Sequence, residues 1–396
     1  MTMEKNIIDQ VFPETLKILA DLIKFQTVSG TSNLKLIEYC EKKLNESGAT
    51  SFKTFHKSGL QANLFSTING KEKLNSEGII LSGHTDVVPA SSNEWSSDPY
   101  IAQEKDNKVY GRGSCDMKGF IACTLVMAPL FAKQKLKKPI HFSYTYDEET
   151  SCLGAPVLLK ELKKRNVNYS VCIIGEPTDM KAIHAHKGYN EYKTYFTGLA
   201  GHASDPVHGV NAIEYAIRYA NKLMELREEL KKRKPRDSVF TPPYSTLQIG
   251  KISGGLFTNV IADQCTVDWE VRPVTPEDGK FINQNIESYV EETLLPEMRK
   301  VYPQSNIKKE TVGETIGFSK VEKSDAVDFI CNLTGDNSRG VVSFGTEAGL
   351  FQELGISTVV CGPGSIEQAH TIDEYVTFDQ LKLCLKMLVD LRNRLI

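Results

Sequence analysis

Nitrogen and oxygen side chains that could hold a metal recur along this chain at points where a predicted strand ends. They are His84, Asp86, Asp116, Glu148, Glu149, Glu176 and His370. Imidazole and carboxylate donors without thiolates are typical of hydrolytic sites that hold one or two divalent metals. The residue types therefore point to metal-assisted hydrolysis.

Short apolar runs precede several of these side chains, at 78–83, 140–146 and 169–175. Helices are predicted between and before them, at 13–25, 33–47, 117–133 and 152–165. Strands that alternate with helices indicate a mostly parallel α/β sheet flanked by helices on both faces. The carboxyl ends of parallel strands meet at one edge of the sheet, so residues far apart in the sequence could converge there.

The pattern changes near residue 186. From there we expect a strand at 188–197, a helix at 211–230, strands at 245–252 and 264–272, a helix at 279–300 and a strand at 306–312. This βαββαβ order is a ferredoxin-like unit. We therefore predict that residues 1–185 and 313–396 form a catalytic domain, which an α+β domain at 186–312 interrupts.

The first helix of the predicted inserted domain carries a regular apolar stripe. Its members are Ile213, Ile217, Ala220 and Met224. Their spacing is close to the period of a helix, which predicts that this stripe is the buried face.

Composition narrows the class of protein. The formal net charge of −3 over 396 residues gives no general attraction to nucleic acid or to anionic membranes. The basic run 231–236 is interpreted as a solvated loop. Nine scattered cysteines without a Cys-x-x-Cys pair favour a reducing compartment. With no signal-peptide block and no run of 18 apolar residues, we expect a cytoplasmic protein that binds neither nucleic acid nor membrane.

Five ordered strings carry a resemblance to a known family. They are Gly-His-Thr-Asp at 83–86, Gly-Arg-Gly-Ser-Cys-Asp-Met-Lys-Gly at 111–119, Asp-Glu-Glu-Thr at 147–150, Gly-Glu-Pro-Thr at 175–178 and Gly-His-Ala-Ser at 201–204. Together the chain resembles the dinuclear zinc metallopeptidases and deacylases. The resemblance implies a zinc-exopeptidase-like sheet with an inserted lid and dimerisation domain. It also implies two Zn²⁺ ions per subunit, replaceable by Co²⁺, a small N-acyl amino acid as substrate, and a homodimer.

The same resemblance assigns the metal ligands. His84, Asp116 and Glu176 would hold one ion, and Asp116, Glu149 and His370 the other, so that one carboxylate bridges both. A shared carboxylate keeps two cations about 3.5–4 Å apart. In this family the peptide bond after the bridging aspartate is typically cis.

Two acidic residues beside the ligands are assigned supporting chemistry. Asp86 is expected to fix the tautomer of the His84 imidazole. Glu148 is expected to act as general base, because it neighbours a ligand but points the other way if the backbone is extended there. The alternative for Glu148 and Glu149 is an exposed acidic turn.

Three predicted site residues lie in the inserted domain. By resemblance, His202 stabilises the oxyanion in a neighbouring subunit's site. Asn259 is assigned to substrate binding, and Arg272 could clamp a substrate carboxylate. The alternatives are a loop histidine for His202 and an exposed strand residue for Arg272.

Three stretches, at 185–188, 209–214 and 362–370, are assigned to the choice of substrate. They are most similar to those of family members that remove the acetyl group from N2-acetyl-L-ornithine in arginine biosynthesis. Glu347 would suit the substrate ammonium, and Gly362 and Gly364 would line the pocket. The alternatives are desuccinylation of succinyl-diaminopimelate, hydrolysis of dipeptides or other N-acyl amino acids, and an inactive relative that binds amino-acid derivatives.

Overall fold

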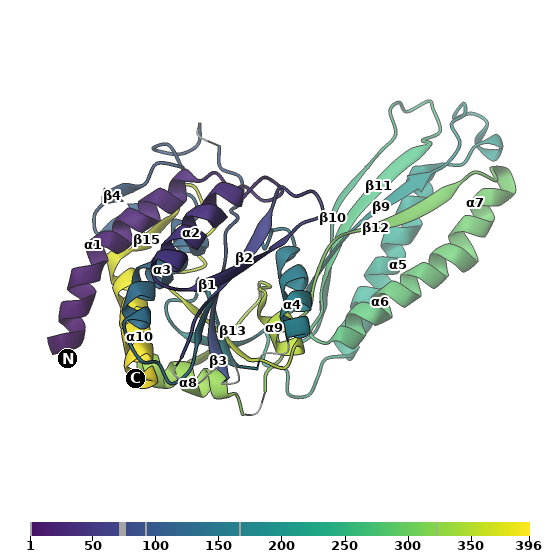
Figure 1. The fold of residues 1–396 in the computed structure, drawn as a ribbon. Coiled ribbons are helices and arrows are strands. Elements are labelled where there is room, and N and C mark those ends of the chain that lie inside the picture. The colour runs from purple at the N-terminus through teal and green to yellow at the C-terminus, as the bar shows by residue number, and fades with distance from the viewer. Residues whose placement is uncertain (1, 71–76, 92, 166–167, 322) are drawn as a thin grey trace. The chain divides into compact units, whose positions relative to one another are not determined.

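The computed structural model describes residues 2–70, 77–91, 93–165, 168–321 and 323–396 (Figure 1). The chain divides into two compact units. The main domain comprises Met1–Ala185, Ser319–Gly340 and Thr346–Ile396, and the insert comprises His186–Phe318 and Val341–Gly345. The sequence predicts that the insert ends at 312. That position lies inside β12 (Asn306–Thr315), the last strand of the insert, because the strand is longer than the apolar pattern indicates.

The main domain is built on an eight-stranded sheet with the order β1-β2-β6-β3-β7-β14-β8-β13. Its strands are β1 (Thr50–Phe55), β2 (Ala62–Ile68), β3 (Gly78–His84), β6 (Ile140–Thr145), β7 (Tyr169–Pro177), β8 (Ala182–His186), β13 (Arg339–Val342) and β14 (Ser357–Gly362). The four neighbours β6, β3, β7 and β14 run parallel to one another. This confirms the predicted mostly parallel sheet, with antiparallel strands added toward both edges.

Seven helices of the described main domain surround this sheet. They are α1 (Thr2–Lys24), α2 (Leu34–Glu46), α3 (Gly119–Ala132), α4 (Gly154–Arg165), α8 (Asp325–Thr334), α9 (Ala348–Glu353) and α10 (Phe378–Leu395). α3 is apolar on nearly every side, contacts β2, β3, β6 and β7, and is covered by α1 and α10. The stretch Ser114–Ala132 is long and apolar enough to cross a membrane, but 78% of its most apolar window is buried, which is the environment of a core helix.

A small three-stranded sheet lies beside the main sheet. It consists of β15 (Tyr375–Thr377), β5 (Lys108–Tyr110) and β4 (Gln103–Lys105), in that order. A short helical turn, η1 (Ser114–Lys118), follows β5 and leads directly into α3. The pairing of β15 with β5 therefore brings the chain just after residue 370 next to the chain just before residue 116.

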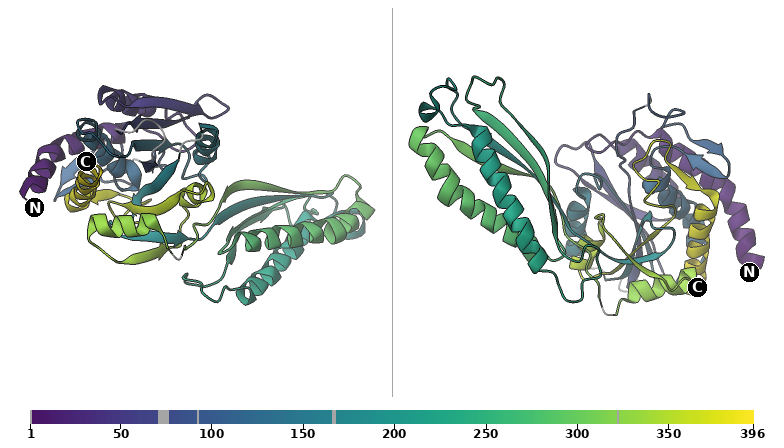
Figure 2. Two further views of the ribbon diagram at one scale, coloured as in Figure 1. Left: turned by 60° about the horizontal axis from the view of Figure 1, so that its bottom comes forward. Right: turned by 180° about the vertical axis from the view of Figure 1, so that it is seen from behind.

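The insert has a four-stranded antiparallel sheet with the order β10-β11-β9-β12, as a ferredoxin-like unit requires. Its elements are β9 (Tyr189–Thr197), η2 (Pro206–His208), α5 (Ala212–Lys232), β10 (Thr246–Gly254), β11 (Gln264–Arg272), α6 (Pro276–Tyr289), η3 (Val290–Leu294), α7 (Leu295–Val301) and β12. Figures 1 and 2 show α5 and α6 along the same face of this sheet, where their apolar residues form a second core.

The buried face of α5 differs from the predicted one. The helix buries Ala216, Tyr219 and Leu223. Of the predicted stripe, Ala220 is buried, whereas Ile217 is 48% and Met224 is 38% exposed. Two apolar stripes run along this helix, and the sequence period cannot tell which of them meets the sheet. The stripe that the sequence assigns to the core is left partly uncovered.

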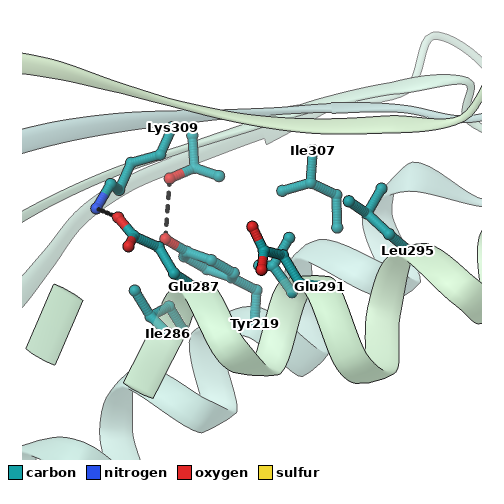
Figure 3. A pocket seen from close by; sticks show the side chains of 9 residues that line it. Tyr219, Ile286, Glu287, Glu291, Leu295, Ile307 and Lys309 are labelled. Carbon is teal, nitrogen blue, oxygen red and sulfur yellow. Dashed lines mark hydrogen bonds and ion pairs between the residues drawn. The ribbon is translucent and has the colours of Figure 1, made fainter. Parts of the chain in front are cut away.

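A cavity of about 210 Å³ lies within the insert, between β9 and β12 on one side and α5, α6 and η3 on the other (Figure 3). Among its lining residues the Thr194 hydroxyl donates to the hydroxyl oxygen of Tyr219 over 3.1 Å, and Lys309 pairs with Glu287. None of the predicted site residues lines this cavity.

Candidate metal centre

Four neighbouring parallel strands bring the candidate ligands to one edge of the main sheet. His84 is the last residue of β3, Glu149 follows β6, Glu176 lies near the end of β7, and His370 is in the loop after β14. Asp116 lies in η1, which contacts β3 and β7. The convergence predicted from the ends of parallel strands therefore describes how these side chains meet.

Asp116 lies at the centre of the cluster. Its Oδ1 is 2.9 Å from His84 Nε2, and its Oδ2 is 3.3 Å from His370 Nε2. Glu149 Oε2 is 2.8 Å from the same nitrogen of His370, and Glu176 Oε1 is 3.7 Å from His84 Nε2. One carboxylate thus faces both imidazoles through its two oxygens, as a bridging ligand must. The Asp116–Met117 peptide bond is cis.

Two overlapping groups of donors could each surround an ion. His84, Asp116 and Glu149 form one group, and His84, Glu148 and Glu176 form the other, with one ligand atom from each residue within 4.8 Å of the others. Glu148, predicted to act as base, therefore lies within the same cluster as the ligands.

The electrostatics of the cluster fit divalent cations. Burial, and then the charge of Asp116, raise the pKa of Glu149 to about 7 and raise the pKa of Glu176 well above its ordinary value. One buried oxygen of each, Glu149 Oε1 and Glu176 Oε1, has no hydrogen-bond partner among the described residues. Buried carboxylates are stable when they are paired or coordinate a metal. Two divalent cations would supply both the missing charge and the missing partners.

The His84 tautomer is set by a main-chain group. Its Nδ1 lies 2.9 Å from the carbonyl oxygen of Asp86 and 3.5 Å from the Asp86 carboxylate. A carbonyl can only accept, so Nδ1 carries the hydrogen and Nε2 of the neutral ring has a free lone pair facing Asp116. The Asp86 carboxylate instead accepts the main-chain N–H groups of Glu148 and Glu149 and the hydroxyl of Ser29.

The backbone at the acidic pair is not extended. Residues 147–150 form a bend and turn, and Asp147 has a φ of 51°. The extended backbone on which the predicted opposite directions of Glu148 and Glu149 depended is therefore absent at these residues. The Asp147 carboxylate holds this turn by accepting from Gly30 N over 2.8 Å and from the Gln61 amide.

Comparison with known proteins decides the family. Residues 80–394 match the sequence profile of peptidase family M20/M25/M40. The chain belongs to the M20/M25/M40 family. It is a metallohydrolase of a family with a dinuclear metal site, and the resemblance stated from the five strings is confirmed.

Known proteins of similar length have sequences similar to this one. An acetylornithine deacetylase of Pasteurella multocida (strain Pm70) is 34% identical over 92% of this chain and 94% of its own. One of Salmonella typhimurium (strain LT2) is 38% identical over 76% of this chain and 75% of its own.

Solved structures of other proteins share the fold. A metallo-carboxypeptidase of Sulfolobus solfataricus has a TM-score of 0.75 at 16% identity, covering 96% of this chain and 98% of its own. A tripeptidase of Staphylococcus aureus has a TM-score of 0.73 at 20% identity, covering 97% and 98%. Both confirm the fold class.

Of the residues predicted to choose the substrate, Glu347 lies in the main domain close to the metal cluster. It is 1% exposed and its Oε1 has no hydrogen-bond partner among the described residues. Burial raises its pKa to about 7.

The two glycines have a packing role. A Cβ on Gly362 would lie 2.0 Å from the carbonyl oxygen of Gly175, and one on Gly364, whose φ is 90°, would lie 2.4 Å from Cys115 Sγ. Close backbone approach is thus sufficient to require glycine at both positions. Their contact with substrate remains a prediction.

The other predicted residues belong to the insert. His202 is exposed, its Nδ1 lies 2.7 Å from Ser204 Oγ, and its loop is joined to that of Asn259 by a hydrogen bond from Ala203 N. Arg272, on β11, pairs with Glu270 over 3.3 Å and lies over the Tyr189 ring. The structure therefore brings His202 and Asn259 together, while Arg272 has partners of its own.

Sequence reasoning missed one group beside the cluster. Glu374 is fully buried and accepts hydrogen bonds from the backbone that carries Asp116. Its partners lie more than 250 residues away in the sequence, so a local pattern gives no sign of them. One signal could have found Glu374. It lies four positions after the candidate ligand His370, and supporting carboxylates commonly accompany metal ligands.

Proposed function

We propose that the chain removes the acetyl group from N2-acetyl-L-ornithine and releases L-ornithine and acetate, a step of arginine biosynthesis. The observation that carries the proposal is the 34% identity over 92% of the chain to a protein named acetylornithine deacetylase. Two zinc ions are the proposed metals, and Co²⁺ would substitute because imidazole and carboxylate ligands accept both.

The proposed ligand sets follow the contacts around Asp116. His84, Asp116 and Glu176 would hold one ion, and Asp116, Glu149 and His370 the other. Bound divalent ions supply charge that polarises an amide carbonyl and lowers the pKa of a hydrolytic water. Every other role falls to the side chains of the protein.

Glu148 is the proposed general base. Its main-chain N–H donates to Asp86 over 3.0 Å, which holds it beside the ligands. Its carboxylate would take a proton from the hydrolytic water and pass it to the leaving amine nitrogen, which converts a poor leaving group into a neutral amine.

The insert is proposed to complete the site across a homodimer. His202 would stabilise the oxyanion, and Asn259 and Arg272 would bind the substrate's polar groups. Dimerisation is supported by apolar surface on the insert, since Ile217 is 48%, Met224 is 38% and Phe257 is 70% exposed.

Sedimentation experiments test the proposed homodimer. Wild type should be a dimer, and the double variant Ile217→Glu/Met224→Glu should be a monomer. A wild-type monomer would refute the proposed dimerisation.

Glu347 is proposed to favour the cationic substrate. A buried carboxylate with an unpaired oxygen would attract the δ-ammonium of acetylornithine. Glu347→Gln should lower the preference for N2-acetylornithine over neutral N-acetylnorvaline by about 10- to 100-fold, the worth of a hydrogen bond to a charged group. An unchanged preference would show that the ammonium is recognised elsewhere.

A kinetic panel tests the substrate directly. We expect the largest kcat/KM for N2-acetyl-L-ornithine among this compound, N-succinyl-diaminopimelate, N-acetylmethionine and simple dipeptides. A larger value for the succinyl compound or for a dipeptide would replace the deacetylase assignment. A cytoplasmic location is also proposed, supported by nine buried cysteine side chains that suit a reducing compartment.

A further inference from the structure

Glu374 occupies a position between the two loops that carry Asp116 and His370. Its side chain is fully buried, and so is the neighbouring Arg112, which is 4% exposed and lies over the Trp95 ring. Burying a carboxylate is costly unless its oxygens are hydrogen-bonded, so the partners of Glu374 indicate what it holds in place.

Four donors converge on this one carboxylate. Oε1 accepts the main-chain N–H groups of Cys115 over 2.8 Å and Asp116 over 2.9 Å. Oε2 accepts the N–H of Gly113 over 2.9 Å and Arg112 Nη1 over 2.7 Å. Backbone N–H groups that point into one concavity form an anion-binding nest, and Glu374 fills this nest.

The same residue fixes the other loop. Its carbonyl oxygen accepts Gly111 N over 3.0 Å, and it lies four positions after His370. Asp373, its neighbour, accepts Ser96 N and the Ser96 hydroxyl over 2.9 and 2.6 Å. The segment that presents His370 is thus fastened at its C-terminal end to the backbone that presents Asp116.

We propose that Glu374 is a positioning residue that sets His370 against Asp116, and thereby determines the affinity of the ion held by Asp116, Glu149 and His370. The inference rests on the proposed metal-dependent function. The ion held by His84, Asp116 and Glu176 depends on it less, because His84 and Glu176 are placed by the strands β3 and β7.

Titration of the metal-free chain with Co²⁺ tests the proposal, followed by calorimetry and by the cobalt absorption spectrum. In Glu374→Gln the amide hydrogens would face the donors of Arg112 and Gly113, so the carboxylate bonds could not all be replaced. We expect wild type to bind two ions. The variant should bind the first ion with an affinity within about threefold of wild type. It should bind the second about 10- to 100-fold more weakly, as for the loss of a group that supports a ligand.

Asp278→Asn provides a matched control. This insert carboxylate is 2% exposed and accepts hydrogen bonds from the Ser245 hydroxyl and Arg233 Nε, over 2.5 and 2.7 Å. It belongs to the insert, whereas the candidate ligands belong to the main domain. It should lower stability and leave both Co²⁺ affinities and the spectrum unchanged. Glu374→Asp keeps the negative charge near Arg112 but is too short to reach all four donors, and should also weaken the second ion.

The outcomes separate the two levels of the proposal. If wild type binds two ions and folded Glu374→Gln or Glu374→Asp binds both equally well, Glu374 is only a structural residue and the inference is wrong. If wild type binds no Co²⁺, the metal-dependent function fails, and the positioning role fails with it.

Discussion

At the scale of single residues, the proposed general base Glu148 carries the prediction about turnover. It lies in a buried cluster with three other carboxylates, and burial raises its pKa well above its ordinary value. A general base must be ionised at the working pH, and nearby positive charge lowers a carboxyl pKa. If Glu148 is the base, metal loading would therefore make it readier to accept a proton.

Replacing Glu148 tests whether this residue is a general base or a metal ligand. Glu148→Gln should lower kcat by about 10²–10⁴-fold, the usual contribution of general acid–base catalysis, and leave two bound ions per chain. Metal content and steady-state kinetics measure both. The matched variant Glu149→Gln should lose metal, because Glu149 contacts His370 over 2.8 Å. Loss of metal in Glu148→Gln would make Glu148 a ligand instead.

His141 makes folding sensitive to acid. It is 3% exposed, its Nε2 has no partner among the described residues, and burial lowers its pKa to about 3 from 6.5. A lowered pKa means that the unfolded state binds the proton first. The stability that neutral His141 contributes is therefore complete above pH 6.5 and is lost as the pH falls toward 3.

The expected loss between pH 6.5 and pH 5 is about 2 kcal/mol, because each pH unit corresponds to about 1.4 kcal/mol. Urea denaturation of His141→Gln, which is neutral at every pH, should show a correspondingly smaller loss over this range. His208→Gln, at an 81% exposed side chain, serves as control and should follow wild type. If His141→Gln and wild type lost the same stability in acid, His141 would not be the cause of the acid sensitivity.

The types of the site residues could be predicted from the sequence, but not their directions. Nothing local to 147–150 specifies the turn there, because Asp147 is held by Gly30 and Gln61 from distant segments. In the same way, the carbonyl of Asp86 and not its carboxylate is the nearer partner of His84. Such contacts depend on tertiary packing, which residue spacing does not contain.

At the scale of elements, the ends of four parallel strands build the site, and their ladder pairings fix the register. The strands were predictable because β3 and β7 are short, mostly apolar runs that end in polar residues, and because β6 alternates Ile140, Phe142 and Tyr144 with polar residues. The buried face of α5 was not, because Ile217 and Leu223 lie on competing apolar stripes and only the second is covered. Periodicity identifies an amphipathic helix, but the partner decides which stripe is buried.

The orientation of α5 leads to a prediction about stability. Leu223 is fully buried, so Leu223→Ala should lower the free energy of unfolding by about 2–5 kcal/mol through lost packing and a residual cavity. Glu225→Ala, at a 68% exposed side chain two positions away, should change it by no more than about 0.5 kcal/mol. Chemical denaturation measures both. Similar small effects would mean that the helix presents its other stripe to the sheet.

At the scale of the whole molecule, the metal centre joins segments from nearly the full length of the sequence. Its donors run from His84 to His370, and its buried carboxylates repel one another without cations. Ions that bind only the folded chain stabilise it by mass action. Metal loading would therefore contribute to both folding and chemistry.

Restoring metal to the metal-free chain is the most direct test of this function. Acetate release from N2-acetyl-L-ornithine would be measured after chelation and after stepwise addition of Zn²⁺. We predict that chelation abolishes release and that about two equivalents of metal restore it, since the ions supply the charge that activates water and carbonyl. Full activity after complete metal removal, or no hydrolysis of any N-acyl amino acid by the fully loaded chain, would contradict it.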